Sequence, residues 1–148
     1  MHAQKSPSLT MAALAMFAAA ALHVAALLAG PAMITALGAP ESVVQSSQQG
    51  TMLAPLVILG IAAALAVLGF YALSGAGRLR PLPFVRPVLG AASGIFFLRA
   101  LALPAVLLLT PAAPGQVPPF EFATSLLCLL IGFAFLPGLR RQAHTRTA

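Results

Sequence analysis

Four long apolar runs, joined by short polar segments, constrain this chain more than any other feature. The runs cover about residues 9–29, 52–74, 87–109 and 119–136. Each approaches the roughly 20 apolar residues with which a helix crosses a bilayer. Only 7% of the residues are charged, whereas soluble domains carry about 25%. We therefore predict an all-α, polytopic membrane protein that is a four-transmembrane-helix bundle.

The positions of the basic residues predict how the spans are oriented. Seven of them lie in polar segments: Lys5, Arg78, Arg80, Arg86, Arg140, Arg141 and Arg146. The segments at 30–51 and 110–118 contain no Lys or Arg. Because cytoplasmic loops are enriched in Lys and Arg, we expect both termini and the 77–86 loop to be cytoplasmic. A composition rich in Ala, Pro and Arg with a single Lys indicates a bacterial source, so the expected location is the bacterial inner membrane.

The loops are too short for a soluble domain, so we expect residues 1–148 to form a single integral membrane domain. Residues 40–49 begin with Pro-Glu, which favours a first helical turn, and we predict a short periplasmic helix there. The first run has a second interpretation as a cleaved secretory signal, because Lys5 precedes it. Its length of about 21 residues exceeds the usual apolar region of 7–15, which favours a retained span.

Small residues predict which helix faces meet, because membrane helices associate through close backbone approach. One stripe of the first span is small and is expected to face the bundle: Ala12, Ala15, Ala19, His23, Ala26 and Gly30. The opposite face is bulky and is expected to face lipid: Leu14, Phe17, Val24 and Leu28. Gly90 and Gly94 have the GxxxG spacing, and we expect them to mark contacts within the bundle more than dimerisation.

Arg99 is the one basic residue inside an apolar run. It lies about 12 residues into the third span and therefore near the bilayer midplane. Insertion scales put the cost of arginine there at about 2.5–3.5 kcal/mol, and such residues usually mark a functional site. The alternative is a structural arginine that donates to carbonyls of neighbouring helices or reaches an interface through tilt of the helix.

The partner of Arg99 is the main open question of the sequence. The chain has two acids, Glu41 and Glu121. Helical side chains lean toward the N-terminus of their own helix, so Arg99 and Glu121 lean apart, and about 12 Å of depth separates them. We therefore expect no direct pair, with Glu121 acting as a first-turn acid favoured by the helix dipole.

Other polar residues are expected to surround Arg99 instead. In the fourth span one face gathers the polar and small residues Glu121, Thr124, Ser125, Cys128 and Gly132. His23 leans from the first span toward the depth of Arg99 and can accept a hydrogen bond from it. We predict one intramembrane polar cluster made of Arg99, His23, Thr124, Ser125 and Glu121.

Several kinds of chemistry find no support in the residues. Cys128 is the one cysteine, so an internal disulfide or CxxC pair is excluded. His2 and His144 lie in the tails, far from His23, and no motif of metal, haem or phosphate binding occurs, so we expect no cofactor. The basic residues flank apolar runs without interleaved aromatics, which argues against nucleic acid. In span count the chain is similar to small multidrug resistance transporters, but it lacks their glutamate in the first span.

Three classes of function remain. The scarcity of ionisable groups favours a small, non-catalytic inner-membrane protein, either a membrane partner subunit or a lipid-interacting bundle. A small oligomeric transporter or channel would use Arg99 and His23 to line an anion or proton path. A protein that binds a quinone or lipid would use Arg99 as a donor to it. The expected partners are the lipid bilayer and either further copies of the chain or a membrane partner protein.

Overall fold

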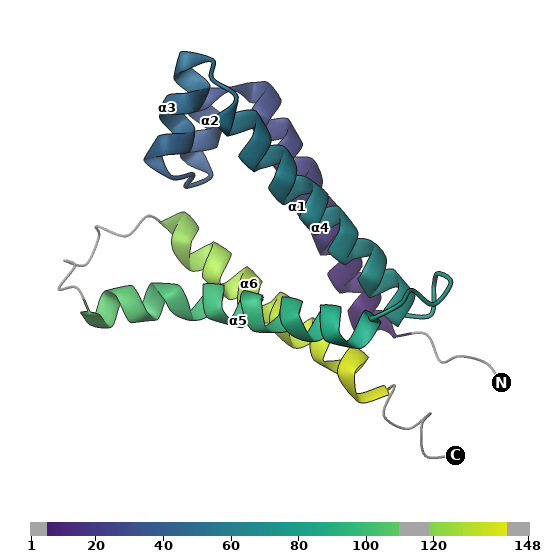
Figure 1. Cartoon of the computed structure of the whole chain (residues 1–148). Coiled ribbons are helices and arrows are strands. Elements are labelled where there is room, and N and C mark those ends of the chain that lie inside the picture. The colour runs from purple at the N-terminus through teal and green to yellow at the C-terminus, as the bar shows by residue number, and fades with distance from the viewer. Residues whose placement is uncertain (1–5, 110–118, 142–148) are drawn as a thin grey trace. The chain divides into compact units, whose positions relative to one another are not determined.

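The computed structural model describes residues 6–109 and 119–141, and these residues form six helices and no strand (Figure 1). The helices are α1 (Pro7–Ala29), α2 (Pro31–Ala36), α3 (Glu41–Gln49), α4 (Leu53–Gly75), α5 (Val85–Leu109) and α6 (Pro119–Arg141). The all-α prediction is confirmed for this part of the chain. Lys5, Arg146 and the 110–118 segment, on which part of the orientation argument rests, lie outside the described residues.

Three of these helices, α1, α4 and α5, are long and apolar enough to cross a membrane. The apolar part of α6, Phe120–Leu136, is shorter. Large apolar side chains on these helices are exposed, among them Leu28 at 82% and Leu108 at 86%. Such exposure is costly in water and costs nothing in hydrocarbon, so the helices are compatible with a membrane-embedded protein.

The chain divides into two compact units, and the division falls within α1 and α4. One unit is Leu14–Gly69, and the other combines Met1–Ala13 with Phe70–Ala148. We call them the α2–α3 unit and the α5–α6 unit. That the whole chain forms one domain stays a prediction.

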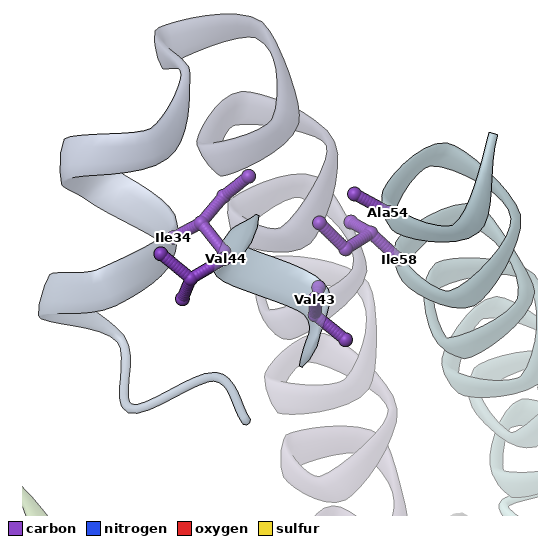
Figure 2. Packing of buried hydrophobic residues seen from close by; sticks show 5 residues of the cluster. All are labelled: Ile34, Val43, Val44, Ala54 and Ile58. Carbon is purple, nitrogen blue, oxygen red and sulfur yellow. The ribbon is translucent and has the colours of Figure 1, made fainter. Parts of the chain in front are cut away.

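The core of the α2–α3 unit lies where α2 and α3 pack on the start of α4 (Figure 2). It consists of Ile34, Val43, Val44, Ala54 and Ile58, each no more than 6% exposed. Gly30, at φ +92°, separates α1 from α2. Gly50, at φ +69°, ends α3 in the left-handed conformation, which glycine adopts without a steric penalty.

Ser46 fixes the connection from α3 to α4. Its Oγ accepts a hydrogen bond from the Ala54 amide at 2.8 Å and lies 2.7 Å from Thr51 Oγ1. Ser46 is 4% exposed, so the hydroxyl satisfies a first-turn amide of α4 that has no acceptor within its own helix. The α3 helix occupies the segment in which the sequence predicts a short helix.

Phe17 corrects the predicted lipid-facing stripe of α1. Its ring packs against Gly69 of α4, so closely that a Cβ at residue 69 would lie 2.8 Å from a ring carbon. Leu14, Val24 and Leu28, on the same predicted stripe, are exposed. The prediction for Phe17 was wrong because an aromatic ring fills the space above a helical glycine, which a pattern of small and large residues on one helix does not reveal.

In the α5–α6 unit, the start of α1, the end of α4 and the start of α5 converge. The Ser6 amide donates to the Ala76 carbonyl at 3.3 Å. A Cβ at Gly75 would lie 3.0 Å from the Leu89 side chain and 3.3 Å from that of Leu9, and both leucines are fully buried.

The α5 and α6 helices pack through a polar contact and aromatic rings. Ser93 Oγ donates to the Gly132 carbonyl at 2.9 Å. The Phe97 ring covers Gly132 and meets Phe133 edge-on, with ring centroids 5.0 Å apart. Gly94 does not take part, because a Cβ there would have no neighbour within 4 Å among the described residues. Between α5 and α6 the contact lies one residue earlier, at Ser93, and the expectation that Gly94 marks a contact within the bundle stays a prediction.

Candidate intramembrane polar site

Arg99 of α5 forms an ion pair with Glu121 of α6. Its Nη2 donates to Glu121 Oε2 at 3.0 Å, and the two side chains are 41% and 28% exposed. Arg99 lies ten residues before the end of α5, or about 15 Å along the helix, whereas Glu121 lies about 3 Å from the start of α6. The pair therefore joins the interior of one apolar helix to the end of the next.

This pair overturns the expectation that Arg99 and Glu121 stay apart. The contact between Ser93 and Gly132 fixes the register of the two helices. Arg99 lies about 9 Å beyond Ser93, and Glu121 about 16 Å beyond Gly132 in the same direction. Arg99 and Glu121 therefore differ in depth along the helix axes by about 7 Å, and not by 12 Å. Long charged side chains extend along a helix to reach a polar partner, so they can bridge this difference. Side-chain lean is an average tendency, and it does not prevent this.

Ser125 supplies an unsatisfied polar group on the same face of α6. It is 8% exposed, and its Oγ has no hydrogen-bond partner within the described ranges. Glu121, Ser125 and Cys128 lie within about 60° of one line along the helix at 100° per residue. Arg99 bonds to the first of them. The Ser125 hydroxyl therefore lies on the stripe of α6 that Arg99 faces.

Pro104 removes the usual hydrogen-bond donor of a backbone carbonyl next to Arg99. It lies inside α5 and has no N–H, so the Ala100 carbonyl cannot receive its usual intrahelical hydrogen bond. In membrane helices such freed carbonyls are satisfied by side chains or water. Sequence reasoning missed the freed Ala100 carbonyl and the Ser93 contact. A proline inside an apolar run was the signal for the freed carbonyl.

Two members of the predicted cluster have local partners. Thr124 Oγ1 donates to the Phe120 carbonyl of its own helix at 2.7 Å. His23 Nδ1 lies 2.8 Å from the Ala19 carbonyl, which can only accept, so Nδ1 donates this hydrogen bond. His23 belongs to the α2–α3 unit and Arg99 to the α5–α6 unit. Their meeting in one cluster stays a prediction.

The chemistry open to the α5–α6 site follows from these groups. In the described part of the chain the ion pair uses one of the five N–H donors of the guanidinium. The Ser125 hydroxyl can donate and accept. No group of three or more His, Cys, Asp or Glu side chains among the described residues could hold a metal ion. The site can thus bind a small polar group by hydrogen bonding.

No protein-family model, curated protein or solved structure matches this chain.

Proposed function

We propose that the protein is a four-span membrane protein of a bacterial inner membrane, with both termini in the cytoplasm. The fourth span is α6. Its apolar part, Phe120–Leu136, has 17 residues, which is the lower end of the range of about 17–25 with which a helix crosses a bilayer. The seven basic residues outside the apolar runs support the orientation, because Lys and Arg gather on the cytoplasmic side.

The orientation can be tested by labelling cysteines with a membrane-impermeant maleimide in intact cells. In a Cys128→Ser background, Ser42→Cys on α3 and Pro81→Cys between α4 and α5 introduce single thiols at exposed positions. We expect Ser42→Cys to be labelled from outside and Pro81→Cys only after the cells are opened. The reverse pattern would refute the orientation.

Within the membrane, we propose that the protein acts by binding, as a lipid-interacting bundle or a partner subunit, and not as an enzyme. The observation that carries this proposal is that both carboxylates of the chain are engaged. Glu121 is paired with Arg99, and Glu41 Oε1 accepts a hydrogen bond from Gln45 Nε2 at 3.1 Å. General acid–base catalysis uses a titratable side chain within reach of a substrate proton, and the two glutamates of the chain have local partners.

A second function is favoured by Ser125 alone: the binding of a hydrophobic molecule with a polar head, such as a quinone or lipid, beside Arg99. A buried hydroxyl without a partner costs about 1–3 kcal/mol. A carbonyl or phosphate oxygen that enters this face of α6 would accept from Ser125, and the 41% exposure of the Arg99 side chain leaves its guanidinium accessible.

Native mass spectrometry from a mild detergent separates these functions. The binding proposal predicts that phospholipid or a partner protein is retained by the wild type and equally by the double variant Arg99→Leu/Glu121→Leu, which keeps the site neutral. A ligand beside Arg99 would be lost from the double variant and from Ser125→Ala. Retention of nothing, together with ion flux through reconstituted vesicles that depends on Arg99, would instead establish a transporter.

A further inference from the structure

The connection between α4 and α5 carries a dense basic patch. Residues 77–86, which we call the arginine loop, contain three arginines and no acid. Arg78 and Arg80 are exposed, and Arg86 is partly buried in the first turn of α5. Arginine binds phosphate oxygens with two parallel N–H donors, which makes it the preferred side chain for recognising phosphate groups.

Exposed apolar side chains alternate with these arginines. Leu79 is 44% exposed, Leu82 37% and Phe84 76%. A loop that only binds dissolved anions gains nothing from such side chains. Apolar side chains interleaved with basic residues are the pattern of a segment that lies in the interface between headgroups and acyl chains.

The arginine loop is held in one conformation by the end of α4. Ser74 Oγ donates to the Arg80 carbonyl at 3.1 Å and accepts from the Leu82 amide at 2.9 Å. Gly77, at φ +70°, closes the helix, because the next amide, that of Arg78, bonds back to the Leu73 carbonyl at 3.0 Å. The arginines are therefore presented on a fixed backbone.

Phe84 shows how strongly the loop backbone is constrained. It has φ +58°, which is uncommon for a residue with a bulky side chain. A non-glycine residue with this left-handed backbone conformation costs on the order of 1–3 kcal/mol, and the conformation persists only where the surrounding structure holds it in place. Its carbonyl accepts the first helical hydrogen bond of α5, from Val88 at 3.1 Å, so this conformation starts the helix while the ring stays exposed.

We propose that the arginine loop binds the phosphate headgroups of anionic phospholipids, with Phe84 inserted at the boundary between headgroups and acyl chains. The loop joins α4 and α5, two helices long enough to cross a membrane, so it lies at a bilayer surface in either orientation. The inference deepens the proposed lipid interaction, but it depends on these two spans and not on which side is cytoplasmic.

The chain contains no tryptophan, so Phe84→Trp provides a single reporter at this loop. The full-length variant is reconstituted in vesicles of zwitterionic and anionic phospholipid, with either one or the other brominated to quench tryptophan. We expect quenching by both, and more by the anionic lipid than its mole fraction predicts. Each arginine near a charged surface is worth about fivefold in binding, so the local enrichment should be several-fold.

Matched variants assign the preference to this loop. A triple variant in the Phe84→Trp background replaces the three arginines of the loop: Arg78→Gln, Arg80→Gln and Arg86→Gln. In this variant each lipid should quench in proportion to its mole fraction. Glutamine at Arg140, Arg141 and Arg146 removes the same charge from the C-terminal segment and should leave the preference intact. Leu56→Trp, an exposed position at the start of α4, should show no preference at all.

The proposal would be overturned by equal quenching by both lipids in the parent reporter, by an equal loss of preference in the C-terminal triple variant, or by no quenching of the Phe84→Trp reporter by either lipid. Relief of the preference by excess inorganic phosphate would mean that the loop recognises a free anion instead, which also contradicts it. A wrong orientation would appear only in the maleimide labelling and leave the quenching unchanged, so failure of the inference and failure of the proposed orientation are distinguishable.

Discussion

Removing Glu121 should destabilise the protein more than removing Arg99, its partner in the ion pair. Glu121→Leu leaves a lone arginine about 15 Å from the nearer end of α5. Arg99→Leu leaves a lone glutamate in the first turn of α6, close to the polar boundary. The depth of the charge left behind, and not the lost 3.0 Å contact itself, should decide the cost.

The magnitudes follow from these depths. An unpaired arginine at the centre of a span costs about 2.5–3.5 kcal/mol on insertion scales, and partial exposure of Arg99 makes this an upper value for Glu121→Leu. Arg99→Leu loses a partly exposed ion pair worth about 0–1 kcal/mol, and the remaining Glu121 stays favoured by the helix dipole by about 0.3–1 kcal/mol. The double variant removes both charges and should lie within about 1 kcal/mol of the wild type, since apolar replacements of a pair are often neutral.

The free energy of unfolding can be measured by titrating SDS into mixed micelles and following the far-ultraviolet circular dichroism. We expect Glu121→Leu to cost at least about 1 kcal/mol more than Arg99→Leu, and the double variant to recover most of the loss. As a control, Arg86→Leu lies on the same helix but about 20 Å before Arg99. Its effect should add to that of Glu121→Leu within about 0.5 kcal/mol.

Equal costs for the two single variants would refute the depth argument. An additive double variant would refute the pair itself, because two side chains that do not interact lose nothing jointly. Neither result could be attributed to the introduced residue, since leucine replaces both partners.

Three further predictions concern packing, each read from thermal unfolding of the purified protein. Ser93→Ala should lower the free energy of unfolding by about 0.6–1.7 kcal/mol, because the Ser93 hydroxyl bonds across to α6. Ser125→Ala should be neutral or stabilising, because the Ser125 hydroxyl has no partner in the described part of the chain. Equal losses for the two variants would contradict this. Gly69→Leu should cost about 1–3 kcal/mol through overpacking against a ring of α1, whereas Gly60→Leu, with open space around it among the residues the structure describes, should stay within about 0.5 kcal/mol. Ser46→Ala should cost about 0.5–2 kcal/mol through loss of the cap on α4, and an unchanged midpoint would show that water replaces the hydroxyl.

The helices themselves could be predicted from the sequence because their determinants are local. The four apolar runs became α1, α4, α5 and α6, and the first three agree with the structure to within two residues at each end. Prolines and glycines near the ends set those limits. The exception is α6, which continues to Arg141. We expected it to end at Leu136, before a proline that the helix instead incorporates.

The packing could not be predicted in the same way, because it depends on the register between helices. The GxxxG pattern identifies a face of small residues, but it does not say which face meets the partner. On α5 that face is set by Ser93 and Phe97, which contact Gly132 of α6. A serine that donates to a carbonyl across the interface is indistinguishable in sequence from one that bonds within its own helix.

The ion pair illustrates the same limit at the candidate site. Arg99 and Glu121 stand out in the sequence as the charged residues of the apolar runs, since charge within such runs is rare. Their pairing was rejected from an average side-chain direction and an assumed register. An offset of about 7 Å is within reach of two extended side chains, whereas 12 Å is not, so an error of about three residues in register reversed the conclusion.

The pair also removes the difficulty of inserting α5. Arg99 and Glu121 are 22 residues apart in sequence and lie on consecutive helices, so they can meet as soon as these two helices form a hairpin. A hairpin with a neutral pair carries no net charge across the bilayer interior, and the cost of a lone arginine is avoided without any contribution from α1 or α4. The seven basic residues that remain all lie outside the apolar runs. The one cation within an apolar run is therefore neutralised locally, and the others remain available for the orientation and the lipid binding that we propose.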